Sequence, residues 1–165
     1  MICCLDVDYQ ATRGNCSAVL FQHWEDAVPA KIYSSVTDPV APYEPGAFYK
    51  RELPCMLNTL HLVEEKINTL VIDGYVWLGE NRGGLGFHLY ETLKRQIPVI
   101  GVAKSKFRGV ECVALPVLRG KSGNPLWVTS IGMDVQDAAR HIEQMAGEFR
   151  LPDLIKLADM ECRKW

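Results

Sequence analysis

The sequence predicts a mixed α/β fold, in which one sheet begins with three antiparallel strands, continues with parallel strands and carries helices on both faces. Three observations support this fold. The first third of the chain alternates apolar and polar residues between short turn-forming clusters, which is typical of antiparallel hairpins. Residues 70–73 and 97–103 are continuous apolar runs, which is typical of strands covered on both faces. Segments with apolar residues at helical spacing separate these runs.

Size and composition indicate an ordinary globular protein. The chain has 165 residues, of which 48% are hydrophobic and 23% charged, so we expect a single domain over residues 1–165 that buries its own core. The formal net charge of −2 provides no global basic field, so binding to nucleic acid would need a local basic patch. No apolar run approaches the roughly 18 residues of a membrane span, so no membrane partner is expected.

The 6 cysteines show neither the CxxC spacing nor the His–Cys clustering of a zinc site. Several of them lie in apolar segments, where cysteine behaves as a small hydrophobic residue. Asp6 and Asp8 argue against a secretory signal peptide. We therefore expect reduced thiols and a cytoplasmic location.

The expected elements follow from local patterns. Pro54 should kink the helix in which it lies or begin a new turn, and Asp134 is well suited to cap a helix. On the pattern alone, a doubly wound sheet fits nearly as well as the mixed one. In chain order, we expect strands at 1–9, 16–24 and 31–36 with a turn at 12–15, a helix at 48–66, a strand at 70–73, a glycine-rich loop at 79–86, a helix at 85–95, strands at 97–103, 111–118 and 126–130, a helix at 134–145, and a last helix that carries Asp159.

A stiff loop precedes the first helix. Pro42 and Pro45 fix the backbone on either side of Tyr43, and Gly46 permits a sharp turn. The tyrosine is therefore expected at a rigid surface tip, where its ring can stack on a partner or insert into it.

Four carboxylates are candidates for chemistry: Asp6, Glu52, Asp73 and Asp159. Asp6 lies within an apolar strand and needs a partner there, whereas Asp73 ends a buried strand, where open α/β sheets bind their ligands. Hard cations such as Mg²⁺ prefer oxygen ligands of this kind. Three of the four carboxylates also have a purely structural interpretation: Asp73 in a turn, Glu52 paired with Arg51, and Asp159 as a solvated charge. Asp6 is the hardest to explain in that way.

A series of motifs, taken together and in order, resembles the endonuclease V family over almost the whole chain. The combination is specific, although no single motif would be. The motifs are Asp6-Val-Asp-Tyr, Pro42-Tyr-Glu-Pro-Gly46, Arg51-Glu52, Val71-Ile-Asp-Gly74, Gly84-Leu-Gly-Phe-His88, Pro98-Val-Ile-Gly-Val-Ala-Lys104, Asn124-Pro-Leu-Trp-Val128 and Arg150-Leu-Pro-Asp153.

The resemblance implies a ribonuclease H-like fold and Mg²⁺-dependent cleavage of nucleic acid, with Mn²⁺ as an alternative cofactor. The substrate would be DNA containing deoxyinosine, or RNA containing inosine, cut at the second phosphodiester on the 3′ side. Asp6, Glu52 and Asp73 match the family's metal ligands. Asp159 matches a further position with a metal or water role, and Lys104 matches a lysine near the scissile phosphate.

The resemblance also implies a substrate-binding surface. Tyr43, with Pro42 and Pro45, matches the wedge that fills the gap left by the flipped base. Residues matching the surroundings of the base pocket are Gly46, Phe48, Gly74, Gly101 and Ala103. Basic residues that could form the local patch are Lys106, Arg108, Arg119 and Lys121; the alternative is that they are solvated loop charges.

The chain departs from the family pattern at several places. It starts almost at the first catalytic strand, without the N-terminal extension of most members. Tyr75 and Trp77 occupy a loop that bears a histidine in many members, and Met133 follows Gly132 where others have Gly-His. The alternatives are a nuclease without inosine preference and a non-catalytic nucleic-acid-binding relative. Against the latter, four carboxylates without a metal would repel phosphate. A monomer is the default expectation.

Overall fold

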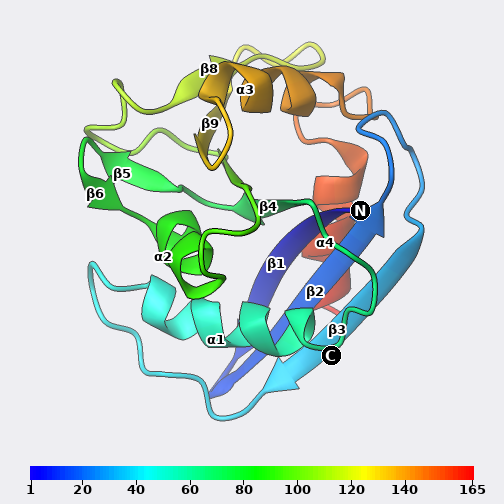
Figure 1. Ribbon diagram of the computed structural model, residues 1–165, viewed down its shortest axis with the longest axis vertical. Helices are drawn as coiled ribbons and strands as arrows, with labels where there is room; N and C mark the ends of the chain where they lie inside the picture. Colours follow the sequence, from blue (N-terminus) through cyan, green and yellow to red (C-terminus); the bar gives the residue numbers. More distant parts are fainter.

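The computed structural model describes residues 1–165, and its core is a seven-stranded sheet with the order β3-β2-β1-β4-β7-β9-β8 (Figure 1). Two further short strands, β5 and β6, form a separate hairpin. The strands are β1 (Ile2–Gln10), β2 (Arg13–Phe21), β3 (Lys31–Thr37), β4 (Thr69–Asp73), β5 (Trp77–Gly79), β6 (Arg82–Gly83), β7 (Val99–Ala103), β8 (Leu115–Val117) and β9 (Leu126–Ile131).

The pairing directions confirm the mixed sheet. Strands β1, β2 and β3 pair antiparallel, and β4 and β7 then add parallel strands beside β1. Strand β9 returns to antiparallel pairing with β7, and β8 pairs antiparallel with β9. The predicted parallel pairing therefore holds for the centre of the sheet, whereas β8 and β9 form an antiparallel pair at its far edge.

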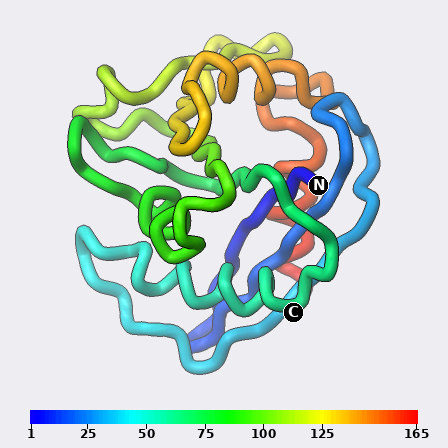
Figure 2. The backbone as a smooth tube through the Cα atoms, viewed as in Figure 1, coloured from blue at the N-terminus to red at the C-terminus, as the bar shows by residue number.

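Four helices cover the two faces of the sheet, as predicted (Figures 1 and 2). Helices α1 (Tyr49–Leu60) and α2 (Leu85–Thr92) pack on one face, and α3 (Val135–Gln144) and α4 (Asp153–Cys162) pack on the other. Successive residues of β1 serve opposite faces, because side chains alternate along a strand. Thus Leu5 packs with α1 and α2, whereas Cys4 packs with α3 and α4.

Several predicted boundaries differ from the structure. The first hairpin turns at Ala11 and Thr12 rather than at 12–15, since Gln10 already pairs with Arg13. Helix α1 ends at Leu60, six residues before the predicted end at 66, and the chain then turns. The predicted strand at 111–118 is reduced to β8, because residues 111–113 form a turn.

All six cysteines are free, and all but Cys112 are buried. None of the helices combines the length and the apolar character that crossing a membrane requires.

Arg119 is a buried structural residue rather than part of a basic surface patch. Its side chain donates hydrogen bonds to the main-chain oxygens of Met145, Gly147, Phe149 and Arg150. These oxygens belong to the connection between α3 and α4, so the guanidinium holds that connection to the end of β8. The expectation that Arg119 contacts nucleic acid is wrong, because only 6% of the residue is exposed.

We expect Arg119→Met to destabilise the fold by about 2–4 kcal/mol, because it leaves buried carbonyl oxygens without donors. Equilibrium unfolding in urea would measure this change. Lys121→Met, at an exposed position in the same turn, is the control and should change stability by less than about 0.5 kcal/mol. Equal stability of the two variants would contradict the structural role of Arg119.

Candidate active site at the carboxyl ends of the parallel strands

The parallel pairing of β1 with β4 brings two of the predicted carboxylates to one edge of the sheet. Leu5 lies beside Ile72 in the register, so Asp6 and Asp73, each one residue further on, lie at the same level. Strand β7 runs parallel to β4 on its other side, and Lys104 follows its last residue. Its ammonium lies 2.7 Å from a carboxylate oxygen of Asp73.

Glu52 reaches the same edge from the first turn of α1. Helix α1 packs across β1, β2 and β3, which brings this turn toward the end of β1. The charge of Glu52 therefore acts together with those of Asp6 and Asp73.

Burial and mutual repulsion make this carboxylate group electrostatically strained. Burial, followed by the negative charge of Asp73, raises the pKa of Asp6 to about 7. Burial, followed by the charges of Asp6 and Asp73, raises the pKa of Glu52 to about 8. Burial would lower the pKa of Lys104, but its hydrogen bond with Asp73 and the nearby carboxylates raise it. A single ammonium is thus the principal counter-charge for the group.

Asp159 approaches Asp6 from the other face of the sheet. It lies on α4, which is fixed to β2 by a 2.7 Å hydrogen bond from the Ser17 hydroxyl to the carbonyl of Ala158. One potential ligand atom each of Asp6, Asp159 and Cys162 lies within 4.8 Å of the others. The guanidinium of Arg163 donates to Asp159 at 2.7 Å and lowers the pKa of its carboxyl.

The donor set is suited to a hard cation. Carboxylates from two strands and two helices face the same edge of the sheet, and such ligands are preferred by Mg²⁺ and similar ions. The ligand atoms that lie within 4.8 Å of one another are those of Asp6, Asp159 and Cys162. Cys162 is a sulfur group near the site, but burial and the charge of Asp6 raise its pKa to about 12. Without a metal ion the sulfur therefore stays a thiol at neutral pH, and a hard cation prefers the oxygen ligands beside it. Asp6, Glu52, Asp73 and Asp159 could hold a divalent metal ion through oxygen alone.

A cavity of about 450 Å³ opens beside the carboxylates. Glu52 and Asp73 form part of its wall, as do three residues predicted for the base pocket: Gly46, Phe48 and Gly74. Four other wall residues are Tyr75, which the sequence analysis placed in a loop after Asp73, and Leu78, Arg82 and Phe107, which it did not single out for the pocket. These four come from the β5–β6 hairpin, its approach and the segment after β7. The cavity combines aromatic surface with the carboxylates, so it could accept a flat, partly apolar group.

Gly101 and Ala103 do not line this cavity, although both were predicted near the base pocket. They are buried in β7. A Cβ on Gly101 would stand 2.6 Å from the carbonyl oxygen of Gly74 and 2.8 Å from the amide nitrogen of Val76. Gly101 therefore permits the chain after β4 to pass close over β7 and shapes the cavity indirectly.

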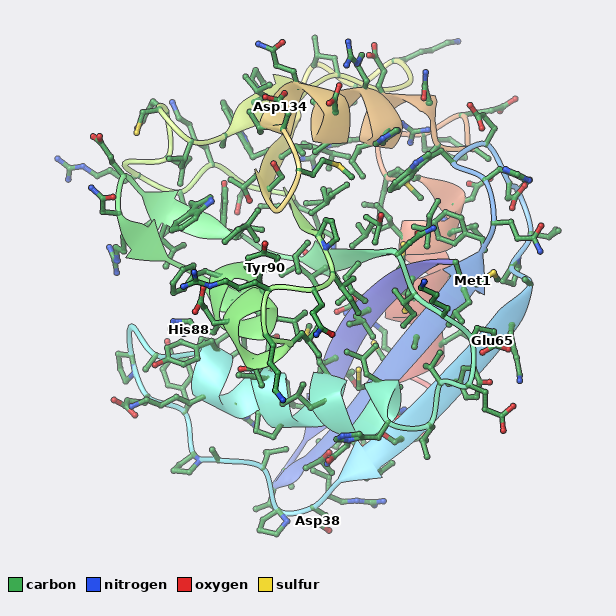
Figure 3. All side chains as sticks on the ribbon, in the orientation of Figure 1. Met1, Asp38, Glu65, His88, Tyr90 and Asp134 are labelled. Atoms are coloured by element: carbon green, nitrogen blue, oxygen red, sulfur yellow. The ribbon has the colours of Figure 1, made fainter.

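Helices α1 and α2 meet at the side of the cavity. The ring of His88 on α2 stacks on Tyr49 of α1, with centroids 3.6 Å apart, and Figure 3 shows His88 between the two helices. Tyr49 itself forms part of the cavity wall. The stacking of these two rings therefore connects the Tyr49 side of the cavity wall to both α1 and α2.

The loop before α1 displays Tyr43 as predicted, with 63% of the residue exposed. Its ring meets Phe48 edge-on at a centroid distance of 6.0 Å, and Phe48 meets Tyr9 in the same manner at 6.2 Å. Pro42 and Pro45 are also exposed, and Gly46 has a φ of 79°, a conformation that favours glycine. Tyr43 thus extends from the rim of the cavity.

The remaining predicted basic residues lie on the surface. Lys106 pairs with Glu111 at 3.3 Å, and its ammonium lies over the Trp127 ring at 5.2 Å. Arg108 and Lys121 are exposed. Lys106 and Arg108 lie two and four residues after Lys104 along the chain.

Comparison with known proteins agrees with the motifs. The sequence model of the family described as Endonuclease V matches residues 1–122. Endonuclease V of Streptomyces avermitilis is 32% identical over 143 residues, covering 74% of this chain and 61% of the relative. Endonuclease V of Bacillus thuringiensis is 28% identical over 174 residues, covering 92% and 73% of the two chains. The chain thus spans about three fifths of the length of the Streptomyces relative.

Solved structures show the same fold. The crystal structure of the Streptomyces avermitilis endonuclease V has a TM-score of 0.77 and 26% identity, with 99% of this chain and 79% of that one covered. Ciona intestinalis endonuclease V, solved with DNA containing an inosine followed by a ribo-adenosine, has a TM-score of 0.81 at 19% identity, covering 99% and 84%. The fold is ribonuclease H-like. From the family match and the relatives together, the chain belongs to the endonuclease V family.

Proposed function

We propose that this protein is a metal-dependent endonuclease that cuts DNA containing deoxyinosine, or RNA containing inosine, on the 3′ side of the altered nucleotide. The observation that carries the proposal is the convergence of Asp6, Glu52 and Asp73 beside a cavity, with Lys104 bound to Asp73. Membership of the endonuclease V family supports it. The proposed cut falls at the second phosphodiester, and the proposed cofactor is Mg²⁺, with Mn²⁺ as an alternative.

The chemistry assigned to these residues requires no protein nucleophile. A divalent ion held by Asp6, Glu52 and Asp73 would supply an activated water and neutralise the phosphate. Lys104 lies next to the carboxylates and would offset the negative charge that develops at the phosphate. Asp159 would contribute a further oxygen on the α4 side of Asp6, where Arg163 now holds it.

The cavity and the exposed tyrosine account for recognition of a base. Enzymes that act next to an altered base take it out of the stack, and a mispaired base costs least to extrude. Phe48, Gly74 and Gly46 would border the extruded base, and Tyr43 would fill the gap that it leaves in the strand. The Ciona relative was solved with DNA containing an inosine, which supports the choice of substrate.

Cleavage of end-labelled oligonucleotides tests the function directly. DNA and RNA strands with and without one inosine would be incubated in Mg²⁺, in Mn²⁺ and in chelator. We expect a metal-dependent cut one nucleotide beyond the inosine, and loss of about 10²-fold or more of the rate in Asp73→Asn, which removes a charged ligand. Cutting that ignores inosine would contradict the substrate, and no cutting at all would contradict the nuclease.

The repulsion within the carboxylate group predicts opposite effects of one variant with and without metal. In chelator at neutral pH, Glu52→Gln should raise the free energy of unfolding by about 1–2 kcal/mol. The pKa of Glu52 rises to about 8 in the folded protein, so the wild type must take up a proton there on folding, whereas the glutamine does not. In excess Mg²⁺ the wild type should gain thermal stability and the variant should gain less.

Thermal unfolding in chelator and across a Mg²⁺ titration would measure both effects. Glu161→Gln, on α4 and paired with Lys164, is the control and should show the wild-type response to Mg²⁺. An equal response of Glu52→Gln and the wild type to Mg²⁺ would remove Glu52 from the proposed ligands.

The exposed tyrosine can be tested separately from the chemistry. Tyr43→Ala should weaken binding of inosine-containing strands by about 1–3 kcal/mol, the usual contribution of base–aromatic stacking. Mg²⁺-dependent stabilisation should stay unchanged, since Tyr43 does not contact the carboxylates. Kinetics on matched strands with and without inosine would measure the effect. Unaltered discrimination in this variant would exclude the wedge role.

A further inference from the structure

Residues 104–114, between β7 and β8, belong to no helix or strand and contribute one residue, Phe107, to the wall of the cavity. The segment begins with Lys104, which forms an ion pair with Asp73, and it contains Phe107, which lines the cavity. A segment without regular hydrogen bonding needs other contacts to hold its shape.

The phenol of Tyr75 bonds to this segment twice. Its hydroxyl donates to the carbonyl oxygen of Ser105 at 2.6 Å and accepts from the amide of Phe107 at 3.0 Å. The two bonded residues lie one and three positions after Lys104, on either side of Lys106. One hydroxyl group therefore closes the chain into a tight turn directly after the lysine.

Other contacts hold the segment as well: Lys106 pairs with Glu111 at 3.3 Å, and the amide of Val110 donates to the carbonyl oxygen of Phe107 at 3.4 Å. Arg150 donates to the carbonyl oxygen of Lys104, which fixes the start of the segment. The centroid of the Phe107 ring lies 6.3 Å from that of the Tyr75 ring and 5.7 Å from the Arg82 guanidinium. The Phe107 amide has no main-chain acceptor, because its partner is the phenol.

We propose that Tyr75 is a positioning residue, whose hydroxyl holds residues 104–107 in the shape that presents Lys104 to the phosphate and Phe107 to the base. This inference rests on the proposed function, and it deepens it by assigning a role to a position at which the chain departs from its family. Tyr75 also lines the cavity. Removing the hydroxyl alone therefore abolishes its hydrogen bonds to the segment and keeps its ring in the cavity wall.

The test is Tyr75→Phe, with Tyr33→Phe as a matched control. Tyr33 loses a comparable hydrogen bond, to Glu65, but it lies on β3 away from the segment, and Figure 3 shows Glu65 beside that strand. Hydrogen exchange of peptides spanning 104–110 measures the anchor without any nucleic acid. We expect exchange of the Phe107 amide to quicken by about 2- to 10-fold in Tyr75→Phe, the effect of losing one hydrogen bond.

Cleavage kinetics on a single-stranded oligonucleotide with one inosine then measure the consequence for function. KM should rise by about 5-fold or more, because the segment must be ordered on binding, while kcat falls less. The melting temperature should match that of Tyr33→Phe, which separates positioning from general destabilisation.

Three outcomes decide the inference. Faster exchange with a raised KM supports it. Unchanged exchange overturns it, whatever the activity, and so does faster exchange with unchanged KM. If the wild type does not cut inosine-containing strands at all, the proposed function fails, whereas the exchange of the Phe107 amide still shows whether Tyr75 anchors the segment.

Discussion

The site depends on parallel pairing between β1 and β4, which sets two carboxylates level at one edge of the sheet. This pairing places like charges together where burial already disfavours them. Other parts of the site offset the repulsion between these charges. Lys104 supplies the nearest counter-charge, Arg163 neutralises Asp159, and the fold supplies enough packing on both faces to hold the group in place.

Hydrophobic clusters on both faces of the sheet supply the stability that the buried carboxylates reduce. Helices α1 and α4 lie on opposite faces of the sheet, and each carries a carboxylate to the same edge. Neither helix is held by that carboxylate. Met56 anchors α1 and Leu154 anchors α4, both almost fully buried, so apolar packing supplies the stability that the acidic group reduces. In each of these helices, one residue supplies the carboxylate and a different residue supplies the apolar packing.

The sequence predicted the parts of the fold that repeat a simple pattern. Alternating strands, continuous apolar strands and Asp134 at the start of α3 all follow local rules, and Asp6 and Asp73 are conspicuous because they interrupt or end apolar runs. The wall residues Arg82 and Phe107 were missed because they lie in segments without periodicity. Arg119 was misinterpreted because its turn has the composition of an exposed loop, and only the tertiary structure shows the carbonyl oxygens around it.

The distribution of cysteines has a practical consequence. Cys112 is the one thiol exposed to solvent, and it lies in the same segment as Phe107, between β7 and β8. A thiol-reactive fluorophore would therefore attach at a single position without cysteine substitutions elsewhere. Its emission would report on the environment of the segment that contributes Phe107 to the cavity.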